Sequence, residues 1–129
     1  MTAAVRITDG TVLLVDVDAE AVVGEGTELP DSLQPKVDLP RVVAASAAGP
    51  TVVALLDRRP PLAISRDAGR TWTEAGGGLP PGFAVAVHPE NPDLILFAGR
   101  NRLYVSENGG VFWRSLATEF DDIDAVAWL

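Results

Sequence analysis

The stretch Ser65–Trp72, which reads SRDAGRTW, decides how this sequence is organised, because a second copy follows it. The second copy, Ser106–Trp113, reads SENGGVFW and lies 41 residues further on (106 − 65). Residues 41–46, 51–56 and 62–64 correspond, in the same order, to residues 83–88, 92–97 and 103–105. A repeat of roughly 40–45 residues has room for four short strands. We therefore expect four strands in each unit, with the quoted motif between the third and the fourth.

The apolar segments of the chain are short, rich in β-branched residues and separated by turn residues. No segment keeps a helical period long enough to predict a helix. This pattern is typical of strands joined by hairpins. The sequence therefore predicts an all-β fold.

A third, degenerate copy of the repeat lies near the N-terminus. Residues 13–23 align without a gap with residues 103–113, with Asp16 in the serine place and Asp18 in the asparagine place. Residues 3–8 then form the second strand of this unit, and the polar, proline-bearing residues 24–40 form a long loop. This unit lacks a first strand, whereas residues 123–129 match a first strand with no unit after them.

The motif Ser-x-Asp-x-Gly-x-Thr-Trp resembles the Asp-box, also called the BNR repeat, of sialidases, sortilin-type receptors and many bacterial β-propellers. The resemblance covers nearly the whole chain apart from residues 24–40, and it implies three four-stranded propeller blades. In that family the motif lies on the blade periphery, so its residues are expected to be structural. They are Ser65, Asp67, Gly69, Thr71 and Trp72 in the complete copy, and Ser106, Asn108, Gly110 and Trp113 in the second copy.

Three blades cannot close a ring, because propellers typically have four to eight of them. An open wedge would expose two apolar blade faces, which a twofold dimer with six blades would cover. We therefore expect a homodimer that exchanges its C-terminal strands. Blade 1 then comprises residues 3–24 plus residues 123–129 of the partner chain, blade 2 residues 41–75 and blade 3 residues 82–117, with Val126 and Trp128 closing the dimer. The alternative is that residues 3–8 are themselves a first strand and the last strand packs elsewhere.

The composition disfavours several kinds of partner. The chain has 129 residues, no cysteine, a formal net charge of -8 and a single lysine, Lys36. It therefore lacks the clustered cations that bind nucleic acids and anionic membranes. It shows no secretory leader and no apolar run near the ~20 residues of a membrane helix, so we expect a cytoplasmic protein. With one histidine, His88, no zinc cluster is expected, and no motif indicates a cofactor.

Four of the arginines fall in two equivalent loops between the second and third strands of their units. They are Arg58, Arg59, Arg100 and Arg102, and such loops gather near the axis of a propeller together with the acidic pair Asp121 and Asp122. Arginine forks suit carboxylate or phosphate groups, which predicts an anionic ligand at this loop face. The alternative is that these arginines only balance neighbouring acidic side chains such as Glu119.

No catalytic residue is indicated by the sequence. A sialidase-like reaction would need a tyrosine nucleophile, and the only tyrosine, Tyr104, lies on a predicted strand where the other repeat has Ala63. We therefore expect a non-catalytic binding or scaffold module, with a protein or anionic small molecule as partner. The alternatives are a carbohydrate-binding or glycosidase-like protein related to sialidases, and a self-assembling domain without a ligand.

Overall fold

The structure is a computed structural model that describes residues 1–30 and 34–129. Within these ranges the chain forms twelve β-strands and no helix. Accordingly, none of the described segments is a helix long and apolar enough to span a membrane. The strands are β1 (Thr2–Ile7), β2 (Val12–Asp16), β3 (Ala21–Gly26), β4 (Val42–Ala48), β5 (Thr51–Leu56), β6 (Leu62–Ser65), β7 (Thr73–Ala75), β8 (Ala84–Val87), β9 (Ile95–Ala98), β10 (Arg102–Ser106), β11 (Arg114–Glu119) and β12 (Ile123–Trp128).

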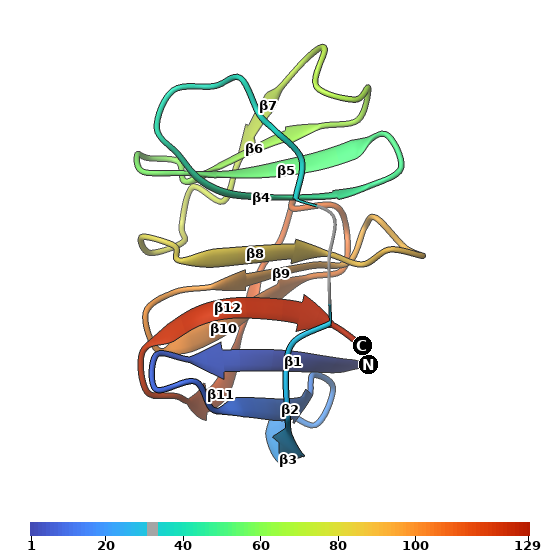
Figure 1. Cartoon of the computed structure of the whole chain (residues 1–129). Helices are drawn as coiled ribbons and strands as arrows, with labels where there is room; N and C mark the ends of the chain where they lie inside the picture. The colour runs from blue at the N-terminus through green and yellow to red at the C-terminus, as the bar shows by residue number, and fades with distance from the viewer. Residues whose placement is uncertain (31–33) are drawn as a thin grey trace.

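The strands form three antiparallel sheets of four strands each, as the repeat predicts (Figure 1). Sheet 1 has the order β12-β1-β2-β3, sheet 2 the order β4-β5-β6-β7 and sheet 3 the order β8-β9-β10-β11. Sheets 2 and 3 are simple meanders, because every strand pairs with its neighbour in the chain. Sheet 1 differs because it joins the two ends of the chain.

Sheet 3 lies between the other two, since its first strand β8 contacts both β4 of sheet 2 and β12 of sheet 1 (Figure 1). Hydrogen bonds between side chains and the backbone link β8 to β4 and to β12, although β8 shares no sheet with either strand. The amide of Val87 donates to Ser46 Oγ at 2.9 Å, and Trp128 Nε1 donates to the carbonyl of Ala86 at 3.0 Å. Both bonds are buried, so each neighbouring sheet satisfies a polar group of β8.

The pairing of β12 corrects one prediction. The strand pairs with β1 of its own chain, with Ala3 opposite Trp128 and Val5 opposite Val126, so the expected exchange between two chains is wrong. Val126 and Trp128 are buried against sheet 3 of the same chain. The physical reason is that β12 is held on both sides within the chain, by β1 and by the buried hydrogen bond from Trp128 Nε1 to the carbonyl of Ala86 on β8. A segment as long as residues 27–41 can extend roughly 50 Å, which is enough to join two sheets that have a third between them.

Two apolar cores fill the spaces between the sheets, and a third cluster lies outside them. One core joins sheets 1 and 3, and the other joins sheets 2 and 3 around Phe97. The third cluster covers the outer face of sheet 2, where Val37 and Leu39 of the β3–β4 connection pack over buried Ala54. The predicted loop 24–40 is thus partly strand, since β3 ends at Gly26, and partly a cover; its residues 31–33 lie outside the described residues.

The degenerate first copy departs from the other two in its turn. Val15 pairs with Val22, whereas the corresponding Val105 pairs with Arg114, so the β2–β3 hairpin is shorter than the aligned β10–β11 hairpin. Asp16 Oδ1 accepts the amides of the residues two and three positions further on, both at 3.0 Å. The gap-free alignment therefore identifies the strands correctly but not the geometry of the turn between them.

Candidate functional site

A cavity of about 410 Å³ lies where the connecting loops of sheets 1 and 3 meet. The β1–β2, β9–β10 and β11–β12 loops reach the same end of the molecule, at the left of Figure 1. We call this the loop-face cavity. Its lining residues come from these loops, from the first residues of β12 and from the segment before β8: Thr8, Phe83, Arg100, Asp122, Ile123 and Asp124.

Backbone hydrogen bonds hold the three loops around the loop-face cavity in place. The amide of Thr8 donates to the carbonyl of Asp122 at 2.9 Å, and the amide of Ile123 donates to the carbonyl of Arg100 at 2.8 Å. These bonds connect the β11–β12 loop to one loop on each side. The walls of the cavity are therefore positioned by the fold before any ligand arrives.

The charged side chains at the loop-face cavity are paired with each other. Arg100 meets Asp122 with two contacts, Nε to Oδ1 at 3.0 Å and Nη2 to Oδ2 at 3.4 Å. The hydrogen bond to this carboxylate raises the pKa of the Arg100 guanidinium above its ordinary value. Asp124 accepts Arg6 Nε at 2.8 Å. Phe83 lines the same cavity and is 46% exposed, so the cavity combines an apolar wall with balanced charge.

Of the six residues predicted for the loop face, the structure brings two, Arg100 and Asp122, to this cavity. Arg58 pairs with Glu74 of sheet 2 at 3.3 Å, and Arg102 pairs with Glu119 at 2.7 Å. Both contacts are of the kind expected in the alternative in which these arginines only balance neighbouring acidic side chains. The other two, Arg59 and Asp121, are not among the lining residues.

Sequence reasoning missed Phe83 and Asp124 as cavity residues. The signal for Phe83 was present, because the other repeat has the charged Arg41 at the equivalent position. The preceding Gly82 passes so close to the core that an added Cβ would lie 2.6 Å from both Leu55 and Phe97. This close approach places Phe83 at the surface rather than in the core.

The predicted structural residues of the motif form two similar turns, neither of which lines the loop-face cavity. The hydroxyl oxygens of Ser65 and Ser106 accept the amides of Gly69 and Gly110, both at 2.8 Å. Each hydroxyl also donates to the side chain two positions on, Asp67 at 2.8 Å and Asn108 at 3.0 Å. Short polar side chains stabilise tight turns in this way.

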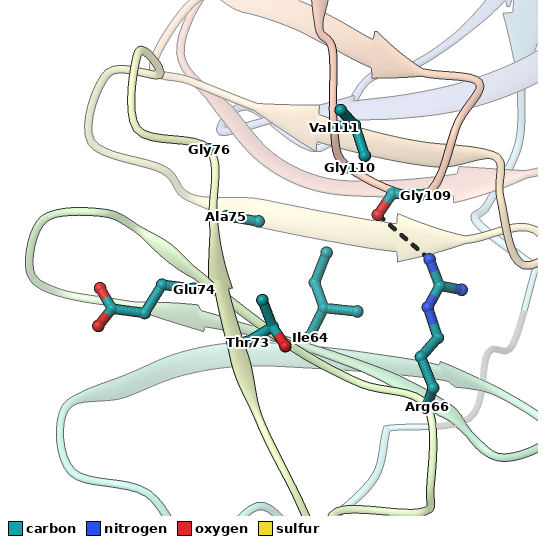
Figure 2. A pocket seen from close by; sticks show the side chains of 9 residues that line it. All are labelled: Ile64, Arg66, Thr73, Glu74, Ala75, Gly76, Gly109, Gly110 and Val111. Carbon is teal, nitrogen blue, oxygen red and sulfur yellow. Dashed lines mark hydrogen bonds between the residues drawn. The ribbon is translucent and has the colours of Figure 1, made fainter.

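A second hollow of about 430 Å³ lies at the periphery, between β7 and the turn that carries residues 109–111 (Figure 2). Ile64 and Ala75 contribute apolar side chains, and Val111 faces them from the turn. Arg66 reaches across, and its Nη2 donates to the carbonyl of Gly109 at 3.2 Å. The sequence did not predict this hollow, which we call the edge slot.

The remaining candidate for chemistry is His88, which has a structural environment. Its Nδ1 accepts the amide of Glu90 at 3.1 Å, and its ring lies 5.4 Å from that of Trp128. Within residues 1–30 and 34–129, no group of three or more histidine, aspartate or glutamate side chains is placed to hold a metal ion.

Comparison with known proteins bears on the fold. The chain is similar to the crystal structure of a GH74 enzyme from Niastella koreensis, with 22% sequence identity and a TM-score of 0.51. The match covers 94% of this chain but only 18% of that enzyme. No protein-family model matches the sequence, and no curated protein matches it. At this identity the likeness supports a β-propeller-like all-β arrangement of the three sheets.

Proposed function

We propose that the chain is a non-catalytic binding or scaffold module, which takes up a ligand or protein partner at the loop-face cavity and completes a propeller ring with a second copy. The observation that carries the binding role is the half-exposed Phe83, which lines the cavity together with the ion-paired Arg100 and Asp122. Ligand sites commonly have volumes of roughly 300–1,000 Å³ with an apolar lining and a few placed polar groups. The cavity of about 410 Å³ matches that description.

Paired charges favour a particular kind of partner at this cavity. Because Asp122 already satisfies Arg100, a simple anion would have to displace a bidentate carboxylate. A ligand with an apolar group and neutral or dipolar hydrogen-bonding groups can instead cover Phe83 and leave both ion pairs intact. A short peptide segment or an amphipathic small molecule has this chemistry.

The proposal of a second copy rests on the outer faces of the end sheets. On sheet 2, Ala45 is partly exposed, and Val37, Leu39 and Trp72 pack over the buried Ala54 and Ala63, so a second copy would meet this apolar cover. On sheet 1, Ala127 and Ala4 stand opposite each other. Pairing each end sheet with the other end sheet of a twofold partner gives six blades.

Ring closure is tested by the mass of the protein in solution. We expect light scattering to give twice the 13.6 kDa of one chain. Ala45→Glu places a charge on the outer face of sheet 2 and is expected to give the single-chain mass with the circular dichroism of a folded protein. Val111→Glu, at a site 69% exposed on sheet 3, is the matched control and should keep the double mass. A wild-type protein of single-chain mass at millimolar concentration contradicts ring closure.

The binding role is tested separately by nuclear magnetic resonance. A library of neutral amphipathic fragments and short peptides should contain members that shift the amides of Phe83, Arg100 and Asp122 together. Phe83→Ser should abolish these shifts while leaving the rest of the spectrum in place. If the active library members shift only amides on other surfaces, or if the shifts of Arg100 and Asp122 persist in Phe83→Ser, the loop-face cavity is not the binding site.

A further inference from the structure

The edge slot has an unusual wall. Its lining residues include four consecutive positions, Thr73, Glu74, Ala75 and Gly76 (Figure 2). Side chains of a strand alternate between two faces, so one face cannot contribute four consecutive residues. The wall is therefore the outer edge of β7 and the residue after it; β7 is the last strand of sheet 2 and pairs with no further strand among the described residues. A free edge presents unpaired backbone amides and carbonyls to whatever enters the slot.

The corresponding edge of sheet 3 is partly covered. Glu20 lies against β11, where its Oε1 accepts the amide of Ala117 at 2.7 Å and its carbonyl accepts the hydroxyl of Thr118 at 2.6 Å. The edge of β7 instead faces a hollow whose opposite wall is the turn of residues 109–111. Gly110 lets this turn pack closely against sheet 2, since a Cβ there would lie 2.6 Å from Ile64 Cδ1 on β6.

The two ends of the slot differ in chemistry. At the end where β7 begins, the guanidinium of Arg66 is 48% exposed and contacts Asp93 only at 3.7 Å. A guanidinium has five N–H donors, and its contacts with Gly109 and Thr51 leave donors for a further acceptor. At the other end the slot continues into a hollow of about 340 Å³, which shares Gly76 and Val111 with it and adds the exposed ring of Phe112.

We propose that the edge slot binds an extended peptide, which adds a strand to β7 and ends in a carboxylate at Arg66. A strand antiparallel to β7 has its C-terminus where β7 begins, which is the end at which Arg66 lies. Its alternate side chains point toward Ile64, Ala75 and Val111, so apolar residues at every second position fit. Addition of a strand to a sheet edge is a known mode of peptide recognition, with affinity from the backbone and specificity from alternate side chains.

This site is distinct from the loop-face cavity, since the two have no lining residue in common. The test uses acetylated hexapeptides with valine or leucine at alternate positions, each made with a free C-terminal carboxylate and as the C-terminal amide. We expect the acids to bind about tenfold more tightly than the amides, because a charge-assisted bond to Arg66 is lost in the amide. Binding should also slow hydrogen exchange of amides within residues 73–75, which indicates strand pairing.

Variants separate the parts of this site. Arg66→Gln should remove the difference between acid and amide, whereas Arg70→Gln, which alters an exposed arginine outside the slot, should preserve it. Val111→Glu should weaken every peptide by about tenfold, and Val23→Glu, at a site 61% exposed elsewhere, should not. Equal binding of acids and amides to the wild type overturns the proposal. So does a failure of millimolar peptide to perturb residues 73–76, or a response confined to Phe83 and Arg100.

Discussion

The turns of sheets 2 and 3 share the hydrogen bonds of their serines but have different surroundings. In sheet 3, Trp113 packs in the core between sheets, with its ring 6.1 Å from that of Phe97. In sheet 2, Trp72 packs on the outer face, beside Leu39 of the β3–β4 connection. The middle sheet has neighbours on both sides, and the end sheet does not. The short motif therefore determines the turn, whereas position in the stack determines what its tryptophan contacts.

A second difference lies inside the turns and concerns two paired positions. In sheet 2, Asp67 Oδ1 accepts the amide of Thr71 at 2.8 Å, and Oδ2 accepts its hydroxyl at 2.6 Å. In sheet 3, Asn108 Oδ1 accepts the amide of Phe112 at 2.9 Å, and phenylalanine has no hydroxyl to donate. Asp67, which has two acceptor oxygens, thus occurs with Thr71, which offers two donors. Asn108, which has one acceptor oxygen, occurs with Phe112, which offers one donor. The turn of sheet 3 accommodates the exposed ring of Phe112 because the side-chain amide oxygen of Asn108 still accepts the backbone N–H of Phe112.

The largest effect is expected from adding one methyl group to the equivalent glycines. Gly69 and Gly110 have φ values of 90° and 93°, so alanine meets the same backbone strain of roughly 1–2 kcal/mol at both sites. At Gly110 the Cβ also lies 2.6 Å from Ile64 Cδ1, whereas at Gly69 the nearest atom is Trp72 Cζ2 at 3.6 Å. Overpacking adds roughly 1–3 kcal/mol. Gly110→Ala should lower the free energy of unfolding by about 3 kcal/mol and Gly69→Ala by about 1.5 kcal/mol, measured by urea denaturation.

Equal losses at the two glycines would contradict the assigned difference in surroundings. The double variant of Gly110→Ala with Ile64→Val provides the control. Removing the Cδ1 methyl should recover part of the loss at Gly110, because that methyl is the atom the new Cβ meets.

The serines test what the two turns share. Ser65 and Ser106 are both fully buried, and each accepts a glycine amide at 2.8 Å. Replacement by alanine leaves the glycine N–H without this partner, which costs roughly 1–3 kcal/mol where the N–H is buried. We expect Ser65→Ala and Ser106→Ala to lower the free energy of unfolding by similar amounts in the same denaturation experiment. A loss at only one serine would show that the two turns are not equivalent.

Much of this fold could be predicted from the sequence, because the repeat identifies strands by their spacing. The boundaries of β5 match the expected residues 51–56, and three four-stranded sheets follow from the alignment. The partner of β12 could not be predicted in the same way. Pairing within one chain and pairing between two chains use the same residues of β1 and β12, so the repeat pattern alone does not distinguish them.

The candidate sites were less predictable, for two physical reasons. Arg100 and Asp122 could be found because they occupy loops whose place in a repeat is known. Phe83 was missed although the other repeat has the charged Arg41 at the equivalent position, because an aromatic residue at the start of a strand resembles a core residue until the close backbone approach at Gly82 is seen. The edge slot arises between β7 of one repeat and a turn of the next, a relation that no single repeat contains.

Acid should distinguish Asp67 from Asn108. Hydrogen bonds from Thr71, led by its hydroxyl, and from Ser65 and the amide of Arg70 lower the pKa of Asp67 from 3.8 to about 2. The ionised group therefore stabilises the fold fully above its ordinary pKa, and this contribution is lost as the pH falls toward about 2. The stability difference between the wild type and Asp67→Asn should narrow from about pH 6 to about pH 2, measured by denaturation at each pH.

Asn108→Asp gives the reciprocal test in sheet 3. Combined with Phe112→Thr it rebuilds the acceptor and donor pair of sheet 2, and this double variant should acquire the same loss of stability in acid. Asn108→Asp alone should acquire less of it, because phenylalanine supplies no hydroxyl. An Asp67→Asn variant whose stability follows the wild type at every pH would refute the role given to the carboxylate.

The smallest effect is expected at the residue before the glycine of each turn. Ala68 has a φ of 61°, and the equivalent Gly109 has a φ of 74°, so only sheet 2 carries a side chain in this left-handed conformation. Ala68→Gly relieves roughly 1–2 kcal/mol of backbone strain but gives the unfolded chain roughly 0.5–1 kcal/mol of additional entropy. The net result should be a gain of about 0.5 kcal/mol in the free energy of unfolding, seen as a small rise in the urea midpoint with an unchanged slope.

Gly109→Ala should do the opposite and lower the free energy of unfolding by about 1 kcal/mol, because it introduces the backbone strain. Its Cβ would also meet the guanidinium of Arg66, which can move aside. A stabilising Gly109→Ala would mean that the two turns differ in backbone as well as in surroundings.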